Sequence, residues 1–178
     1  ALFGIDVKVP GMKVATLAAC PVFGGRLASV DDSKAKAIKG VHQVVRLNDA
    51  AAVVADHMWA AKQGLAALDI RWDEGPNAKL STADIVQQLA AASQRPGVVA
   101  RREGDPAKAM ANAAQKVEAV YEVPFLAHQT MEPINCTVHV RSDGCDVWVS
   151  SQVVTRAQAT AAEVTGLPLD KVKVHNQF

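Results

Sequence analysis

The spacing of apolar residues along the chain predicts short strands that alternate with short helices. The strands are runs of β-branched and small apolar residues between turn-forming residues, at 14–19, 27–31, 41–47, 51–55 and 69–72. The helices are periodic segments with a capping residue, proline or glycine at an end, at 34–38, 57–68, 81–93, 106–114 and 153–165. This alternation indicates an α/β or α+β arrangement with helices packed on a sheet.

The helix predicted over residues 57–68 follows Asp56, whose carboxylate is expected to cap it. Apolar residues at intervals of three and four are expected to form its core-facing side: Met58, Ala61, Leu65 and Leu68. Two other helices have clear start signals. Ser81 or Thr82, with Asp84 in the first turn, opens one, and Asp105-Pro106 opens the other.

The second half of the chain contains three predicted strand regions. Gln115–Val123 alternates apolar and polar residues, which indicates a half-buried strand. Residues 136–140 and 145–150 form the best hairpin candidate, joined through Ser142-Asp143-Gly144. Val172–Val174 begins a last strand, whose partners are expected to lie outside the chain.

Composition narrows the class of protein. The chain has 178 residues, of which 49% are hydrophobic but only 4% aromatic, so its core must consist mainly of Ala, Val, Leu and Ile. A net charge of +1 without a basic cluster argues against nucleic acid as a partner. No apolar run is long enough to span a bilayer, and nothing at the start reads as a signal peptide.

The cysteines do not indicate a metal or iron–sulfur centre. Cys20, Cys136 and Cys145 are far apart and form no Cys-x-x-Cys pair. Cys136 and Cys145 flank the predicted hairpin and can in principle face one another. Buried free thiols are the favoured interpretation, because cysteine commonly behaves as a small hydrophobic residue.

Two motifs carry a resemblance to a known family. The segment Tyr121–Pro133 reads YEVPFLAHQTMEP, and Ser150-Ser151-Gln152 follows the predicted hairpin. Together they resemble the opening of the molybdopterin-binding region in xanthine dehydrogenase and aldehyde oxidase-type molybdenum hydroxylases. Within this family they resemble in particular the large (beta) subunit of the isoquinoline 1-oxidoreductase branch. Upstream, residues 27–45, 52–61 and 70–75 resemble, in order, the a/b hammerhead domain of these enzymes.

The resemblance implies an α+β fold in two parts. Residues 1–100 are expected to form a hammerhead-like mixed sheet with helices, and residues 101–178 the truncated N-terminal part of a molybdopterin-binding domain. The family's glycine-rich cofactor loop is expected directly after Lys171–Phe178. The general base and the later cofactor-contacting segments would also lie outside the chain. We therefore expect a fragment that is inactive by itself and contains no catalytic residue.

Gln152 is the residue most expected to contact the cofactor. In resembling enzymes this glutamine hydrogen-bonds an oxygen ligand of molybdenum, a task that suits a neutral amide because it donates without adding a charge. The alternative is an amide that caps the following helix or faces solvent.

His128, Met131 and Glu132 are candidates for the active-site wall. A histidine and a glutamate four residues apart suggest acid–base or metal chemistry. In this family, however, the dithiolene sulfurs of molybdopterin hold the molybdenum, so no protein metal ligand is expected. We expect His128 and Glu132 to make buried hydrogen bonds that fix their loop, which Pro133 stiffens; direct substrate contact is the alternative. The other histidines show no ligand spacing: His42, His57, His139 and His175.

The leading hypothesis is a piece of a molybdenum hydroxylase large subunit. The resemblance implies that the intact enzyme hydroxylates N-heteroaromatic compounds or aldehydes with water-derived oxygen and passes electrons to an iron–sulfur small subunit. The cofactor is molybdopterin in the intact enzyme, and the fragment alone is not expected to bind it. Such a fragment can self-associate through its truncated surface. The rival hypothesis is a non-catalytic, hammerhead-type docking domain.

Overall fold

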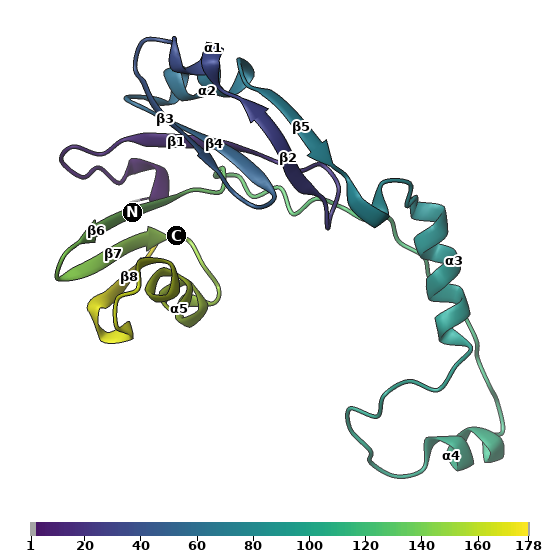
Figure 1. Ribbon diagram of the computed structural model, residues 1–178. Helices are drawn as coiled ribbons and strands as arrows, with labels where there is room; N and C mark the ends of the chain where they lie inside the picture. Colours follow the sequence, from purple (N-terminus) through teal and green to yellow (C-terminus); the bar gives the residue numbers. More distant parts are fainter. Residues whose placement is uncertain (1–2, 178) are drawn as a thin grey trace. The chain divides into compact units, whose positions relative to one another are not determined.

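The computed structural model describes residues 3–177 and has a mixed α+β fold with three small sheets (Figure 1). Its contacts divide it into two compact units. The first, here the continuous unit, is Lys13–Val123. The second, here the split unit, combines the N-terminal residues up to Met12 with the chain from Pro124 onward. The predicted α+β class is confirmed.

The continuous unit contains two antiparallel sheets. One has the order β1-β4-β3 and the other pairs β2 with β5. Their bounds are β1 Val14–Ala19, β2 Arg26–Asp31, β3 Val41–Arg46, β4 Ala50–Ala55 and β5 Asp69–Asp73. The helices of this unit are α1 Ser33–Lys36, α2 Met58–Ala66, α3 Thr82–Ser93 and α4 Pro106–Asn112. All five strands therefore form where the apolar pattern predicted them.

Small residues bring α2 close to the three-stranded sheet. Helix α2 packs against β1, β3 and β4, and its buried residues are Ala60, Ala61 and Gly64. A Cβ atom at position 64 would lie only 2.7 Å from Cγ1 of Val53, which is fully buried in β4. Because the core contains few aromatic residues, it is filled by the close approach of α2 to the sheet rather than by large side chains.

The prediction for the core-facing side of α2 is therefore wrong in part. Ala61 is buried as expected, but Met58 is 46% exposed, and the buried stripe runs through Ala60 and Gly64 instead. The predicted cap is also wrong. His57 is the N-cap residue, and its Nδ1 accepts a hydrogen bond from the Ala60 N–H at 3.2 Å.

Asp56 has a different role, because a lysine and a histidine hold its carboxylate. Oδ1 accepts hydrogen bonds from Lys13 Nζ and pairs with His42 Nε2, both at 2.6 Å. These contacts join the residue before β1 to a side chain of β3, across the end of β4. The hydrogen bond from Lys13, and next that with His42, lowers the pKa of Asp56 from 3.8 to about 2.

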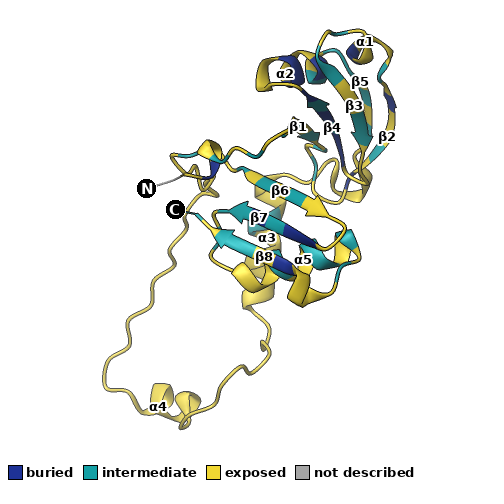
Figure 2. Cartoon of the chain, turned by 90° about the vertical axis from the view of Figure 1, so that its left-hand side faces the viewer, coloured by how far each residue is buried: buried dark blue, intermediate teal, exposed yellow. Residues whose placement is uncertain are grey.

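The helix caps predicted for α3 and α4 are present in the structure. Ser81 and Asp84 form a full capping box at the start of α3, and the Asp105 carboxylate accepts from the Lys108 N–H at the start of α4. Figure 2 colours α4 and its connections as exposed, and the residues of α3 are exposed except Ile85 and Val86, which are half-buried. Within residues 3–177, no helix has the length and apolar character needed to cross a membrane.

The strand predicted over Gln115–Val123 is wrong. These residues have no regular secondary structure, and Val117 and Tyr121 are 94% and 90% exposed. Alternation alone does not make a strand, because a strand needs a neighbour for its backbone N–H and C=O groups. In the described part of the chain, no strand pairs with this segment.

The split unit contains a mixed three-stranded sheet covered on one face by a helix (Figure 1). Its strands are β6 Cys136–Arg141, β7 Gly144–Val149 and β8 Val172–Asn176; its helix is α5 Val154–Thr165, which Gly166 ends in the left-handed conformation. The predicted hairpin of β6 and β7 is confirmed. The partners of β8 were predicted to lie outside the chain. This prediction is wrong, because β8 pairs in parallel with β7.

The sheet register separates the two cysteines of the hairpin. Cys136 pairs with Val149, whereas Cys145 pairs with Val140 at the other end of the strands. All three cysteines are free, but only Cys145 is buried; Cys20 is half-buried and Cys136 is exposed. Burial raises the pKa of the Cys145 thiol, which packs with Val147 and Val172 beneath α5.

Gly64→Ala tests the close approach of α2 to β4. The new methyl group meets Val53 and Val41, so overpacking should exceed the gain in helix propensity and lower the free energy of unfolding by about 1–2 kcal/mol. Urea unfolding in a Trp148→Phe background lets Trp59 and Trp72 report on the continuous unit. Gly97→Ala is the matched control, because nothing lies within 4 Å of a Cβ there. A stabilised Gly64→Ala variant would refute the packing argument.

Asp56→Asn tests the ion pairs at the end of β4. Because the folded-state pKa of Asp56 lies below the ordinary 3.8, the carboxylate stabilises the fold above that pH, and this contribution is lost as the pH falls through about 2. Wild type should therefore be more stable than the variant at about pH 5, with the difference shrinking towards about pH 2.5. Urea unfolding at both pH values measures this difference in stability between wild type and variant. Asp49→Asn, at an exposed position, is the control, and a pH-independent difference would contradict the expectation.

Candidate cofactor-binding edge

Three loops meet at one edge of the sheet in the split unit. Cys136, Val149 and Asn176 are aligned across β6, β7 and β8. The residues before β6, after β7 and after β8 therefore lie at the same edge. This edge contains the carboxyl ends of the parallel strands β7 and β8, where ligands bind in many open sheets that contain parallel strands.

The loop Ser150-Ser151-Gln152 leaves β7 at this edge and is held at two points. The Ser151 N–H donates to Oδ1 of Asn176 at 3.0 Å, and Ser151 Oγ accepts from the Val153 N–H at 3.1 Å. Beside it, the Gln177 N–H donates to the Val149 carbonyl at 3.0 Å.

The Gln152 side chain itself is exposed. It does not cap α5, since the N-cap residue is Val153 and the described residues provide no side-chain cap there. Its amide therefore remains available to a ligand or to water. The Gln152 assignment stays a prediction.

Helix α5 begins at the same edge and adds backbone donors. Its first turn contains no acidic residue. The first N–H groups of a helix lack partners within the helix and carry a partial positive charge. A neutral amide beside such a helix start forms an environment of donors without a carboxylate, which is compatible with an anionic group.

The loop that precedes β6 is held by Glu132. Oε1 of Glu132 accepts from the Ile5 N–H and from Nδ2 of Asn135, both at 2.8 Å. Contact is close here, because a Cβ at Gly4 would lie 2.6 Å from Oδ1 of Asn135. Glu132 thus ties the N-terminal 3-10 turn Gly4–Asp6 to the start of β6.

The other two candidates of this loop do not share that network. Met131 is fully exposed, and His128 is exposed and makes no hydrogen bond within residues 3–177. The structure therefore places Glu132 in a half-buried hydrogen-bond network and leaves His128 outside it. Whether any of the three lines an active site stays a prediction.

Sequence reasoning missed two asparagines, Asn135 and Asn176, that organise these loops. Neither belongs to a motif with a known spacing. Asn135 directly precedes β6 and Asn176 is the last residue of β8, at the edge where the loops meet, so the signal for each was its position relative to the strands. That signal becomes readable only when β8 is known to pair with β7 in parallel.

The face of the sheet opposite α5 has a polar cluster. Asp146 pairs with Arg141 and with His175, each at 2.7 Å, and the His175 ring stacks on Trp148 with 4.9 Å between ring centroids. The hydrogen bonds from His175 and Arg141 lower the pKa of Asp146. This cluster joins all three strands, since its members come from β6, β7 and β8.

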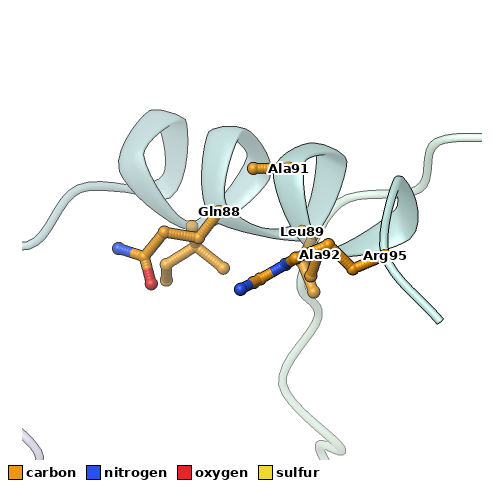
Figure 3. A pocket seen from close by; sticks show the side chains of 6 residues that line it. Gln88, Leu89, Ala91, Ala92 and Arg95 are labelled. Atoms are coloured by element: carbon orange, nitrogen blue, oxygen red, sulfur yellow. The ribbon is translucent and has the colours of Figure 1, made fainter. Parts of the chain in front are cut away.

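Two hollows lie on the described surface. A groove of about 620 Å³ runs between α5 and the hairpin, beside the half-exposed Val138 and Val140 of β6. The second hollow, shown in Figure 3, is formed by side chains of α3 and its C-terminus alone: Ile85, Gln88, Leu89, Ala91, Ala92 and Arg95. Among residues 3–177, no three His, Cys, Asp or Glu side chains are grouped so as to hold a metal ion.

Comparison with known proteins shows which families the second half of the chain and the whole chain are similar to. Residues 91–178 match the molybdopterin cofactor-binding domain family. Isoquinoline 1-oxidoreductase subunit beta of Brevundimonas diminuta is 29% identical over 185 residues, which cover 98% of this chain and 24% of that protein. The membrane-bound aldehyde dehydrogenase [pyrroloquinoline-quinone] of Gluconacetobacter polyoxogenes is 26% identical over 182 residues, covering 97% and 24%.

A solved structure shows the same fold. Aldehyde oxidoreductase from Desulfovibrio gigas matches with a TM-score of 0.71 at 18% identity, over 98% of this chain and 24% of that one. Residues 91–178 thus match the molybdopterin cofactor-binding domain family, and the chain is similar to part of a xanthine dehydrogenase-type large subunit. It spans about a quarter of the length of the curated relatives it matches.

Glu132→Ala tests the anchor between the N-terminal turn and β6. Loss of both hydrogen bonds should make the Ile5 amide exchange with solvent roughly five- to tenfold faster, because a typical hydrogen bond contributes about 1 kcal/mol. Hydrogen–deuterium exchange of the peptide over residues 3–9 measures this. Glu122→Ala, at an exposed position, is the matched control. Equal exchange in both variants would show that Glu132 does not anchor the turn.

Proposed function

We propose that this chain is part of a molybdenum hydroxylase large subunit, in which it supplies a hammerhead domain and the first wall of the cofactor site. The two parts are residues 1–100 and residues 101–178. The ordered pairs of short strands around α2 support the first, and the family match over residues 91–178 supports the second.

A single observation carries the proposal. Within the matched region, an exposed glutamine amide stands on a loop that is hydrogen-bonded to a neighbouring parallel strand. The loop, the start of α5 and the carboxyl ends of β7 and β8 all share this edge. A donor held in place at such an edge is suited to binding a cofactor rather than to ordinary surface solvation.

The residues at the edge fit molybdopterin in their chemistry. They offer neutral N–H donors and no carboxylate in the first turn of α5, which suits an anionic pterin cofactor. The bound cofactor would supply the redox chemistry that replaces a carbon-bound hydrogen with a hydroxyl group. Gln152 would donate its amide N–H to the cofactor, while Glu132 holds the adjacent loop and His128 and Met131 face the substrate side.

The proposed substrates are N-heteroaromatic compounds or aldehydes, and the oxygen comes from water. Support comes from the printed names of relatives, which include isoquinoline and aldehyde enzymes. One relative is named as a subunit, which favours a second, iron–sulfur subunit as partner. The general base lies on other parts of the same large subunit. Produced alone, the chain should lack oxidase activity and can self-associate through its exposed apolar residues.

Gln152→Ala in the intact large subunit, co-produced with its iron–sulfur partner, tests the assignment. Turnover should fall about 10- to 100-fold, as is typical when a residue that tunes a metal site is removed, while molybdenum content by elemental analysis stays near one per subunit. Gln63→Ala, on the exposed side of α2, is the matched control. Full turnover of Gln152→Ala at full molybdenum occupancy would remove Gln152 from the site.

Molybdenum content also separates the proposal from two others. A non-catalytic docking domain would contain no molybdenum. A quinone-dependent dehydrogenase, suggested by the printed name of one relative, would contain none either but would show quinone absorbance. A folded subunit without molybdenum, produced in a host that makes the cofactor, would contradict the proposed function.

A further inference from the structure

We propose that Asn176 is a positioning residue that acts through Gln152. The inference rests on the proposed function and adds a residue to it. Asn176 ends β8, and its Oδ1 accepts the Ser151 N–H across 25 residues of chain. The residue that follows Ser151 is Gln152, so this hydrogen bond fixes the backbone directly before the proposed cofactor ligand.

The loop is held on both sides of Gln152. On one side is the bond between Ser151 and Asn176; on the other, Ser151 Oγ accepts from the Val153 N–H at 3.1 Å and closes a short turn over Gln152. The turn is a local feature and moves with the loop. The bond to Asn176 connects the loop to a neighbouring strand, so it helps to set the position of Gln152 relative to the sheet.

The chemistry of an asparagine suits this task. Its side-chain oxygen accepts the N–H without bringing a full negative charge to the edge where an anionic cofactor is proposed. Its position also suits the task, because β8 pairs with β7 in parallel and the Gln177 N–H binds the Val149 carbonyl beside it. The acceptor therefore stands at the end of a strand that is paired with β7 rather than on a free loop.

Gln158 offers a matched control within the same unit. Its amide likewise makes side-chain to backbone hydrogen bonds, to the carbonyls of Leu169 at 3.1 Å and Val172 at 2.9 Å. These lie at the amino end of β8, away from the proposed cofactor edge. Gln158→Ala thus removes comparable bonds to the same strand without touching the Gln152 loop.

The experiment uses the intact large subunit with its iron–sulfur partner and the variants Asn176→Ala, Asn176→Asp and Gln158→Ala. In Asn176→Ala, kcat should fall about tenfold with KM for the heteroaromatic or aldehyde substrate unchanged, because the residue acts through positioning. Hydrogen exchange at the Ser151 amide should accelerate. Asn176→Asp keeps the acceptor and should retain the protection of the Ser151 amide, but its kcat should stay below that of the wild type because the carboxylate brings a negative charge to the edge proposed for an anionic cofactor. Gln158→Ala should keep wild-type kcat even if it lowers thermal stability.

A double variant decides whether Asn176 acts through Gln152. If it does, Asn176→Ala should have almost no further effect on kcat in a Gln152→Ala background. Independent, multiplying losses would overturn the inference while leaving the proposed function intact, as would unchanged Ser151 exchange in Asn176→Ala. A subunit without molybdenum would overturn both, and the elemental analysis identifies that case separately.

Discussion

The parallel pairing of β7 with β8 is the interaction on which the candidate site depends. Parallel strands cannot be joined by a tight turn, so the chain must cross over, and α5 makes this crossing above the buried residues Cys145, Val147 and Val172. The crossing returns the chain to the end of the sheet where β7 begins, and β8 then runs beside β7 to the carboxyl end. Gln152 and Asn176, which are distant in sequence, therefore come to lie at one edge.

The rest of the fold follows from small residues. With few aromatic side chains, the continuous unit builds its core from alanines and from Gly64, which let α2 approach β4 closely. Such contacts leave little room for change in side-chain volume. Larger apolar residues such as Met58 and Trp59 consequently remain on the exposed side of the same helix. Residues 94–123, which follow α3 in this unit, are all exposed.

Elements defined by neighbours in sequence could be predicted, and those defined by distant partners could not. The capping box of Ser81 and the left-handed Gly166 need only adjacent residues. The strand predicted over Gln115–Val123 was wrong because a strand needs a pairing partner from another part of the sequence, which the local pattern does not reveal. The cap predicted for Asp56 was wrong for a related reason, since Lys13 and His42, both distant in sequence, hold a carboxylate that local rules assign to the helix. In the site, the motif pointed to Gln152 and Glu132, whereas Asn135 and Asn176 depend on strand register.

The divided sequence of the split unit has a consequence for biosynthesis. The contact between Ile5 and Glu132 joins residues 127 positions apart, and the whole continuous unit lies between them. At ribosomal rates of about 5–20 residues per second, Glu132 is synthesised roughly 6–25 s after Ile5. The continuous unit can complete its own core during that interval. The order of translation therefore makes the candidate cofactor-binding edge the last part of this chain to be assembled.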